Sequence, residues 1–257
     1  MEAPRAEEAA ALSPDGWHIR PCFRKGSDPS SDSHLPDPFP AGIMGGVGSF
    51  LNPKRILQLG LGILILARPT CCAEDTYEAE ANRLATLLNW QTGSVVADIG
   101  AGEGQMALLA SSRVGAAGHV YATEVDPKKL AALGKLAREK MRVNLTVVQG
   151  AQDTTNLPRE CCDSIFMRRV YHHFTDPAKI DPSLFQSLKP SGLLAVIDFP
   201  PRSGLPEVVG VPENRGGHGI PKNILINELT SAGFVVESVP KDWPSEDYCV
   251  IFRKPAP

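Results

Sequence analysis

Apolar residues recur along most of the chain, and their spacing alternates between that of helices and that of buried strands. From Tyr77 to Asn89 they fall three or four positions apart, which predicts an amphipathic helix. The predicted helices span 77–89, 105–112, 126–140, 177–188 and 220–232. The predicted strands span 94–100, 119–125, 145–149, 164–170, 193–198, 234–239 and 248–252.

The order of these elements indicates an α/β fold. Strands that alternate with helices form a parallel sheet covered on both faces. The last two strands are joined by only about eight residues, too few for a parallel crossover, so we expect them to pair antiparallel. The pattern therefore predicts a Rossmann-like, doubly wound seven-stranded sheet, mostly parallel with a C-terminal antiparallel hairpin. Ligands of such sheets bind beyond the carboxyl ends of the strands.

The residues before this pattern divide into two segments. Residues 1–43 are rich in Pro and Ser and show no apolar periodicity, so we expect a disordered extension. Residues 44–73 combine a short basic region, an apolar run over 56–67 and small residues, as a secretory signal does. A signal at this position requires that translation begin at Met44; a membrane anchor and a helix packed on the domain are the alternatives. The domain itself is expected over 74–257, exported or membrane-anchored if the segment is a signal and cytoplasmic otherwise.

The composition of the chain argues against a nucleic-acid partner. The chain of 257 residues is 42% hydrophobic and 21% charged, with a formal net charge of −3 and a pI near 6.1. A nucleic-acid-binding protein normally carries a basic stripe and a pI above roughly 9, so we expect no nucleic acid partner. The vicinal pairs Cys71-Cys72 and Cys161-Cys162 are not a disulfide framework, and the second begins a predicted strand, far from any ligand at the strand's other end.

The most informative motif is Asp98-Ile99-Gly100-Ala101-Gly102-Glu103-Gly104, at the turn from the first strand into a helix. Glycines there let the backbone approach a ligand closely. A dinucleotide fingerprint is G-x-G-x-x-G, but Gln105 stands where its third glycine belongs. Asp98 would repel a pyrophosphate and attract a cationic ligand that carries an ammonium and a sulfonium.

Two further carboxylates follow the next strands. Glu124 ends the second strand, where a carboxylate can accept both hydroxyls of a ribose. Asp126, before Pro127, is better explained as a helix cap. After the third strand, Asp153 offers an acceptor for an exocyclic amine of adenine, with a turn-forming aspartate as the alternative.

Together with the turn at Leu188-Lys189-Pro190-Ser191-Gly192 and the closing hairpin, these motifs resemble class I S-adenosylmethionine-dependent methyltransferases over residues 77–254. The resemblance implies S-adenosylmethionine as cofactor, with its methionine part at the glycine turn, its ribose on Glu124 and its adenine on Val125. The run from Arg168 to Pro177 resembles small-molecule methyltransferases of bacteria, and Arg168 is included in the expected site. The expected cofactor-binding residues are Asp98, Gly100, Ala101, Gly102, Gly104, Glu124, Val125, Asp153 and Arg168.

The acceptor side is expected on the loops that follow the fourth and fifth strands. The candidate catalytic residues are Tyr171, His172, His173, Asp198 and His218. Methyl transfer needs an aligned nucleophile and, where the nucleophile carries a proton, a base, a task for which histidine is suited. Asp198 with His172 and His218 is an alternative divalent-metal set, but its spacing is not diagnostic and we expect no metal.

We therefore expect an enzyme that transfers a methyl group from S-adenosylmethionine to the oxygen, nitrogen or sulfur of a small molecule. The insert over 201–219 is short, which disfavours a protein substrate. Two alternatives stay open: a catalytically silent S-adenosylmethionine-binding module, and a nicotinamide-dependent oxidoreductase.

The composition break generates a first prediction. A chain beginning at Glu74 should fold and bind S-adenosylmethionine as tightly as the full chain, because the domain's apolar pattern starts after that residue. Circular dichroism and calorimetry on both chains check this. An insoluble or cofactor-free short chain would show that the apolar run is a packed helix of the domain.

Overall fold

The computed structural model describes residues 73–256. The expectations for segments 1–43 and 44–73 concern residues outside this range, apart from Ala73, where the first described helix begins. The described α-helices are α1 (Ala73–Leu87), α2 (Gln105–Val114), α3 (Pro127–Glu139), α4 (Pro177–Ser187) and α5 (Lys222–Ser231), with two short 3₁₀ helices, η1 (Tyr171–His173) and η2 (Glu213–Arg215). Within residues 73–256, no helix has both the length and the apolar character needed to cross a membrane.

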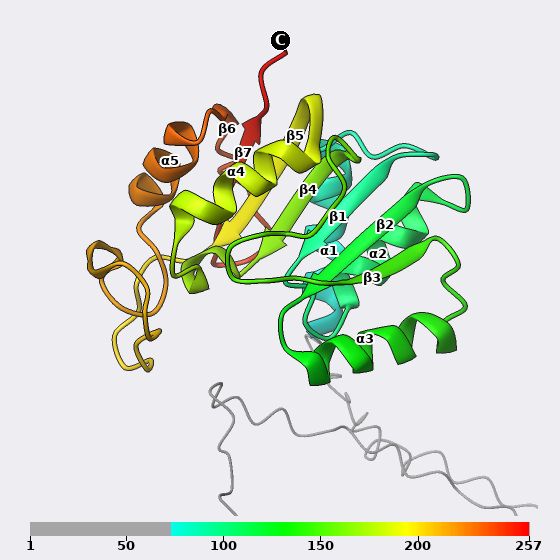
Figure 1. Ribbon diagram of the computed structural model, residues 1–257, viewed down its shortest axis with the longest axis horizontal. Coiled ribbons are helices and arrows are strands. Elements are labelled where there is room, and N and C mark those ends of the chain that lie inside the picture. Colours follow the sequence, from blue (N-terminus) through cyan, green and yellow to red (C-terminus); the bar gives the residue numbers. More distant parts are fainter. Residues whose placement is uncertain (1–72, 257) are drawn as a thin grey trace, which may run out of the picture. The chain divides into compact units, whose positions relative to one another are not determined.

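Seven strands form one sheet in the order β3-β2-β1-β4-β5-β7-β6 (Figure 1). They are β1 (Val95–Ile99), β2 (His119–Glu124), β3 (Leu145–Gln149), β4 (Cys162–Arg168), β5 (Leu188–Asp198), β6 (Val235–Ser238) and β7 (Tyr248–Arg253). All neighbouring pairs are parallel except β5–β7 and β6–β7. The predicted fold class and the antiparallel ending are confirmed, with element ends within a few residues of the predicted ones.

Helices cover both faces of the sheet, as two separate apolar clusters show. Buried residues of α1, α2 and α3, such as Leu84, Ala107 and Leu133, pack with alternate strand residues on one face. On the other face, Leu184 of α4 and Leu229 of α5 pack with the intervening strand residues. Because strand side chains alternate between faces, β1 sends Val96 to the first cluster and Ala97 to the second.

Local sequence explains where α3 begins. Asp126 caps the helix: its side chain accepts hydrogen bonds from the backbone N–H groups of Lys128 at 2.7 Å and Lys129 at 3.2 Å. Pro127 occupies the first helical position, where the missing N–H costs no hydrogen bond. The expectation that Asp126 is a cap rather than a ligand-binding residue is therefore confirmed.

The fifth strand differs from its prediction. It begins at Leu188 rather than Leu193, so the Pro190-Ser191-Gly192 segment belongs to the strand. The register jumps from the pair Cys162–Leu188 to the pair Ser164–Leu193, which leaves the intervening residues as a bulge. Turn-forming residues at this position thus bend the strand and do not end it.

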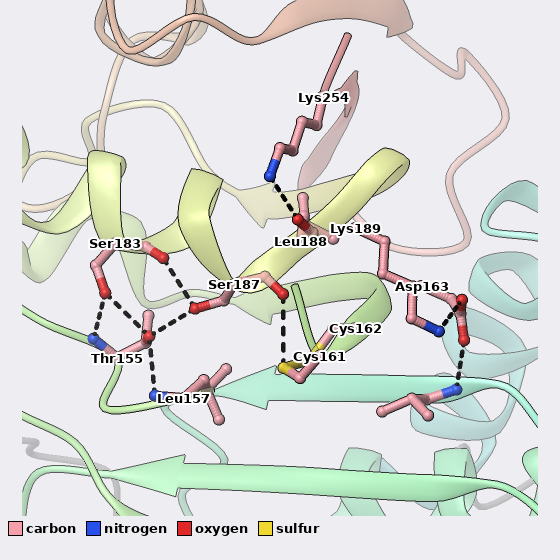
Figure 2. Close-up of a disulfide and its surroundings, with 11 residues drawn as sticks. Thr155, Leu157, Cys161, Cys162, Asp163, Ser183, Ser187, Leu188, Lys189 and Lys254 are labelled. Carbon is pink, nitrogen blue, oxygen red and sulfur yellow. Dashed lines mark hydrogen bonds and ion pairs between the residues drawn. A yellow bond between two sulfur atoms is a disulfide. The ribbon is translucent and has the colours of Figure 1, made fainter. Parts of the chain in front are cut away.

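The vicinal cysteines lie at the amino end of β4, where Cys161 and Cys162 form a disulfide (Figure 2). Nearby, the carboxylate of Asp163 accepts hydrogen bonds from the Val95 backbone N–H at 2.8 Å and from Lys189 Nζ at 2.6 Å. These contacts join the amino ends of β1, β4 and β5. The cysteines are therefore at the opposite end of β4 from Arg168, as the sequence indicated.

Candidate active site

The turn between β1 and α2 leaves open space where a ligand can approach. Gly100 and Gly102 have positive φ values of 69° and 55°, which L-residues with a side chain rarely adopt. A Cβ at Gly100 would lie 2.6 Å from Cγ2 of Val170, so this glycine is also required for packing. A Cβ at Gly102 would meet no atom nearer than 4.0 Å. Ala101 and Gly104 complete the same turn through a hydrogen bond from Gly104 N to Ala101 O at 2.8 Å.

Asp98, at the end of β1, carries a buried carboxyl group that is only partly satisfied. The residue is 3% exposed, and its Oδ2 is a buried atom without a hydrogen-bond partner. Burial raises the pKa of Asp98 to about 8; the carboxylate of Glu124 adds to the rise, whereas a backbone hydrogen bond from Ala107 and the charge of Arg168 oppose it. A cationic ligand beside Oδ2 would favour the ionised form.

Glu124, at the end of β2, ties the glycine turn to the neighbouring strand. Its Oε2 accepts a hydrogen bond from Gly102 N at 3.0 Å, and its Oε1 accepts from Val125 N at 2.8 Å and Asp126 N at 3.0 Å. A carboxylate offers about four acceptor positions, so one remains for a ligand hydroxyl. A second ribose hydroxyl would have to replace one of these backbone donors.

The two residues expected beside adenine are both exposed to solvent. Val125 is 45% exposed, and its Cγ1 would lie 3.5 Å from a Cβ at Gly150, the residue that follows β3. Asp153 is exposed in the turn closed by the hydrogen bond from Ala151 N to Thr154 O at 3.0 Å. An exposed valine is suited to stacking on a base. For Asp153, both the turn-forming and the adenine-binding interpretations stay predictions.

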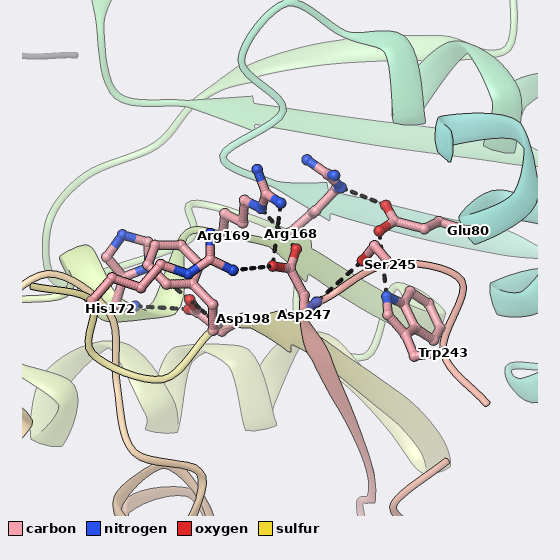
Figure 3. Close-up of polar contacts among 10 residues, drawn as sticks. Glu80, Arg168, Arg169, His172, Asp198, Trp243, Ser245 and Asp247 are labelled. Carbon is pink, nitrogen blue, oxygen red and sulfur yellow. Dashed lines mark hydrogen bonds and ion pairs between the residues drawn. The ribbon is translucent and has the colours of Figure 1, made fainter. Parts of the chain in front are cut away.

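Arg168 ends β4 beside the first strand, but its side chain already has a partner (Figure 3). Its Nε donates to Oε2 of Glu80, a fully buried carboxylate of α1. The other oxygen of Glu80 accepts from Trp243 Nε1 at 3.3 Å, and the guanidinium lies 4.7 Å from the centre of the Tyr77 ring. Arg168 thus fixes α1 against the strand ends, and contact with the cofactor stays a prediction.

A second ion pair, formed by Arg169 and Asp247, lies next to the first in Figure 3. Arg169 donates to the buried Asp247 through Nε at 2.7 Å and through Nη2 at 3.2 Å. Arg202 also approaches Asp247, at 3.6 Å, and its guanidinium lies 4.7 Å from the centre of the Phe199 ring. Sequence reasoning missed Glu80, Asp247 and Arg202, because their partners lie far away in the chain.

His172 and Asp198 form a buried pair at the ends of β4 and β5. His172 Nδ1 lies 2.8 Å from Asp198 Oδ1, with the two side chains 1% and 0% exposed. The same carboxylate accepts from the His172 N–H at 3.1 Å and the Phe199 N–H at 2.9 Å, which fixes its orientation. His172 Nε2 is a buried atom with no hydrogen-bond partner.

Two more imidazoles gather around this pair. The ring centre of His172 lies 4.0 Å from that of His173 and 5.0 Å from that of His218. His218 is carried there by the insert after β5, whose ends pair through Ile220 N to Phe199 O at 2.9 Å and Arg202 N to His218 O at 3.0 Å. The structure therefore brings His172, His173, His218 and Asp198 together, as expected from their positions after the fourth and fifth strands.

Tyr171 does not belong to this group, and its predicted catalytic role is corrected. The residue is fully buried in the second apolar cluster, and its hydroxyl donates to Asp181 Oδ2 at 2.8 Å. Burial beside Asp181 raises the pKa of Tyr171 far above the ordinary tyrosine value. Its backbone carbonyl accepts from the fully buried Arg215 at 2.9 Å. Tyr171 thus anchors η1 to the second apolar cluster.

Comparison with known proteins agrees with this geometry. Residues 97–196 match a family model described as a methyltransferase domain. The ubiquinone/menaquinone biosynthesis C-methyltransferase UbiE of Proteus mirabilis (strain HI4320) is 27% identical over 151 residues, which cover 56% of this chain and 58% of that protein. The chain thus spans little more than half the length of this curated relative.

Solved structures share the fold at low identity. A SAM-dependent methyltransferase from Aquifex aeolicus aligns with a TM-score of 0.58 and 23% identity, over 71% of this chain and 92% of that one. The [4+2]-cyclase SpnF aligns with a TM-score of 0.58 and 17% identity, over 70% and 82%. These likenesses show the fold alone, and the second protein is named for a reaction other than methyl transfer.

The matched segment contains most of the candidate site. It includes Asp98 and the glycine turn, Glu124, and the histidines that follow β4. The family model, the curated relative and the seven-stranded fold point to the same assignment. Over residues 97–196 the chain is similar to a methyltransferase domain, on a fold that a solved S-adenosylmethionine-dependent methyltransferase shares.

Proposed function

We propose that this chain transfers a methyl group from S-adenosylmethionine to a small-molecule nucleophile held beside His172. The observation that carries the proposal is the unpartnered, buried Oδ2 of Asp98 next to the open glycine turn. A buried carboxyl oxygen without a partner is costly to the fold, and a cationic ligand would offset that cost.

The residues present fit the family's cofactor. Asp98 would face the positively charged methionine part of the cofactor. The space above Gly102 would admit the chain of atoms that joins methionine to ribose. The free acceptor position of Glu124 would take a ribose hydroxyl. Val125 would pack on the adenine. When bound, S-adenosylmethionine supplies a methyl carbon already activated by the sulfonium. The protein has then to place a nucleophile about 3 Å from that carbon and to manage its proton.

The acceptor side is supported by the position of the histidines. β4 pairs with β1, so the residues that follow β4 lie beside the glycine turn that follows β1. With Asp198 accepting the Nδ1 proton, His172 presents the lone pair of Nε2, which can take a proton or bind a cation. The curated relative is a C-methyltransferase of ubiquinone and menaquinone biosynthesis, which favours a small acceptor here.

The two alternatives predict different binding results. A catalytically silent module would bind S-adenosylmethionine and methylate no acceptor. A nicotinamide-dependent oxidoreductase would bind NAD, although Asp98 beside the glycine turn disfavours its pyrophosphate. Calorimetry with S-adenosylmethionine, S-adenosylhomocysteine and NAD separates the oxidoreductase from the other two classes, and we expect binding of the first two ligands only. Methyl transfer to an acceptor separates the enzyme from the silent module.

A second prediction concerns the pH dependence of folding stability. Between the ordinary aspartate pKa near 4 and its raised pKa of about 8, Asp98 holds a proton in the folded chain that it loses in the unfolded chain. Relative to Asp98→Asn, the wild-type chain should therefore lose stability as the pH rises through this window, by at most about 1.4 kcal/mol per pH unit. Urea unfolding at pH 5, 6, 7 and 8 measures the difference, with Asp153→Asn in an exposed loop as control. A stability difference between wild type and Asp98→Asn that does not change with pH would contradict a raised pKa of Asp98.

A third prediction concerns Glu124. Its replacement in Glu124→Ala should weaken binding of S-adenosylmethionine by roughly 1.5–3 kcal/mol, because a hydrogen bond to a charged group is lost. Glu103→Ala, in an exposed position of the same turn, is the control. Calorimetry gives both affinities, and thermal unfolding shows whether the loss of the Gly102 contact has disturbed the fold. Equal affinity in the two variants would remove Glu124 from the ribose site.

A fourth prediction separates the acceptor side from the cofactor side. His172→Ala should lower kcat/KM by about 10²–10⁴ and leave the affinity for S-adenosylmethionine nearly unchanged. His119→Ala, at the amino end of β2, is the matched control. A crystal structure with S-adenosylhomocysteine tests the geometry. If both His172 and His173 lay more than about 8 Å from the sulfur, neither could act on a nucleophile in line with it.

A further inference from the structure

The histidine cluster has the composition and spacing of a metal-ligand set. One ring nitrogen from each of His172, His173 and His218 can be chosen so that all three lie within 4.8 Å of one another. Three nitrogens bound to one zinc ion at 2.0–2.1 Å in tetrahedral geometry are about 3.3 Å apart. His172 is buried, whereas His173 is exposed and His218 half-buried, so the approach would be made by the last two side chains.

Hydrogen bonds on two of the rings occupy Nδ1 and leave Nε2 as the candidate ligand atom. His172 Nδ1 contacts the Asp198 carboxylate, and His218 Nδ1 contacts the backbone carbonyl of Pro206 at 2.8 Å. Both acceptors are oxygens, so in each case Nδ1 is the donor and, in the neutral ring, Nε2 keeps the lone pair. A carboxylate or carbonyl behind the ring is the usual arrangement for a histidine that binds a metal.

The charges around the cluster are compatible with a cation. Asp198 adds one negative charge directly behind His172. Arg169 and Arg202, whose guanidinium groups lie by the Phe199 ring, are both paired with Asp247. Arg215, which donates to the Tyr171 and Phe174 carbonyls, is paired with Glu228. Their positive charge is therefore largely compensated, and the buried Nε2 of His172 has no protein partner among the described residues.

We propose that His172, His173 and His218 bind one divalent transition-metal ion, of the class of Zn²⁺, with Asp198 orienting His172, and that the open fourth position takes an oxygen of the methyl acceptor. Three imidazoles favour zinc and related ions over Mg²⁺ or Ca²⁺, which prefer oxygen ligands. Three protein ligands with one open position are typical of catalytic rather than structural zinc sites.

The second half of the proposal rests on the proposed function and names its substrate class: a small molecule with an acidic hydroxyl, phenolic or enolic. On binding the metal, the hydroxyl releases its proton to solvent and becomes an anionic oxygen. That oxygen, or the carbon conjugated to it, then forms a bond to the methyl carbon as the methyl–sulfur bond breaks with its electron pair on sulfur. Attack by carbon is completed by loss of that carbon's proton to solvent.

The fifth prediction is that metal binding depends on this cluster. The full chain, without an added histidine tag, is dialysed free of metal and titrated with Zn²⁺ by calorimetry and with Co²⁺ by visible absorption. We expect His173→Ala and His218→Ala each to bind one Zn²⁺ fewer per chain than wild type, whereas His119→Ala binds the wild-type number. Because only the difference in zinc stoichiometry between wild type and each variant is used, any zinc held by cysteines cancels. Asp198→Asn should keep the site but weaken it by about 10–100-fold.

The outcomes separate this inference from the proposed function. Equal zinc stoichiometry in wild type, His173→Ala and His218→Ala overturns the metal site, even if the chain binds S-adenosylmethionine. Zinc binding that depends on the cluster in a chain without affinity for S-adenosylmethionine keeps the site and overturns the methyltransferase proposal. If both ligands bind, NMR of a catechol added to the zinc-loaded chain tests the substrate class. Line broadening or shifts of the catechol signals that occur with wild type and are lost with His218→Ala support the substrate class. Identical catechol spectra with wild type and His218→Ala reject it.

Discussion

The site depends on the parallel pairing of β1 with β4, two strands that are far apart in the sequence. This pairing places Asp98 opposite Phe166 and Ile99 opposite Met167, so both strands end at the same edge of the sheet. The glycine turn after β1 and the histidines after β4 are neighbours for this reason alone. The close approach of Val170 to Gly100 shows how little room remains between the two loops. A side chain at Gly100 would separate the two halves of the site.

Buried carboxylates are unusually frequent at this edge, and most of them have a structural partner. Glu80 pairs with Arg168, Asp198 with His172 and Asp247 with Arg169, and each pair joins segments from distant parts of the chain. Such pairs add little net stability, because desolvation of the two charges offsets most of their attraction, but breaking one leaves a costly buried charge. Asp98 is the exception, since one of its oxygens has no partner. Its incomplete environment is what a binding site for a cation requires.

The fold could be predicted from the sequence because its signals are local. Apolar periodicity, the Asp126-Pro127 helix start and the short link before β7 together determine the order and direction of the strands. The candidate site was predictable only where a residue lies at or shortly after the carboxyl end of a strand, as Asp98, Glu124, His172 and Asp198 do. Tyr171 failed this rule: whether a residue in a 3₁₀ turn points inward depends on packing against Asp181 and Arg215, which no local pattern shows. The same reason hid Glu80 and Asp247, whose roles exist only through partners 88 and 78 positions away.

The two halves of the site differ in how firmly the fold holds them. Asp98 and Glu124 belong to strands, and Glu124 is fixed by three backbone donors, so the cofactor side is set by the sheet. On the acceptor side only His172 is fixed in this way, through Asp198. His218 comes from the insert after β5, whose position depends on two backbone hydrogen bonds at its base and on the contact of its ring with Phe199. An ion bound by His172 and His218 would join the insert to the buried His172–Asp198 pair. Binding of the ion would thus restrain the insert without moving the strands that carry Asp98 and Glu124.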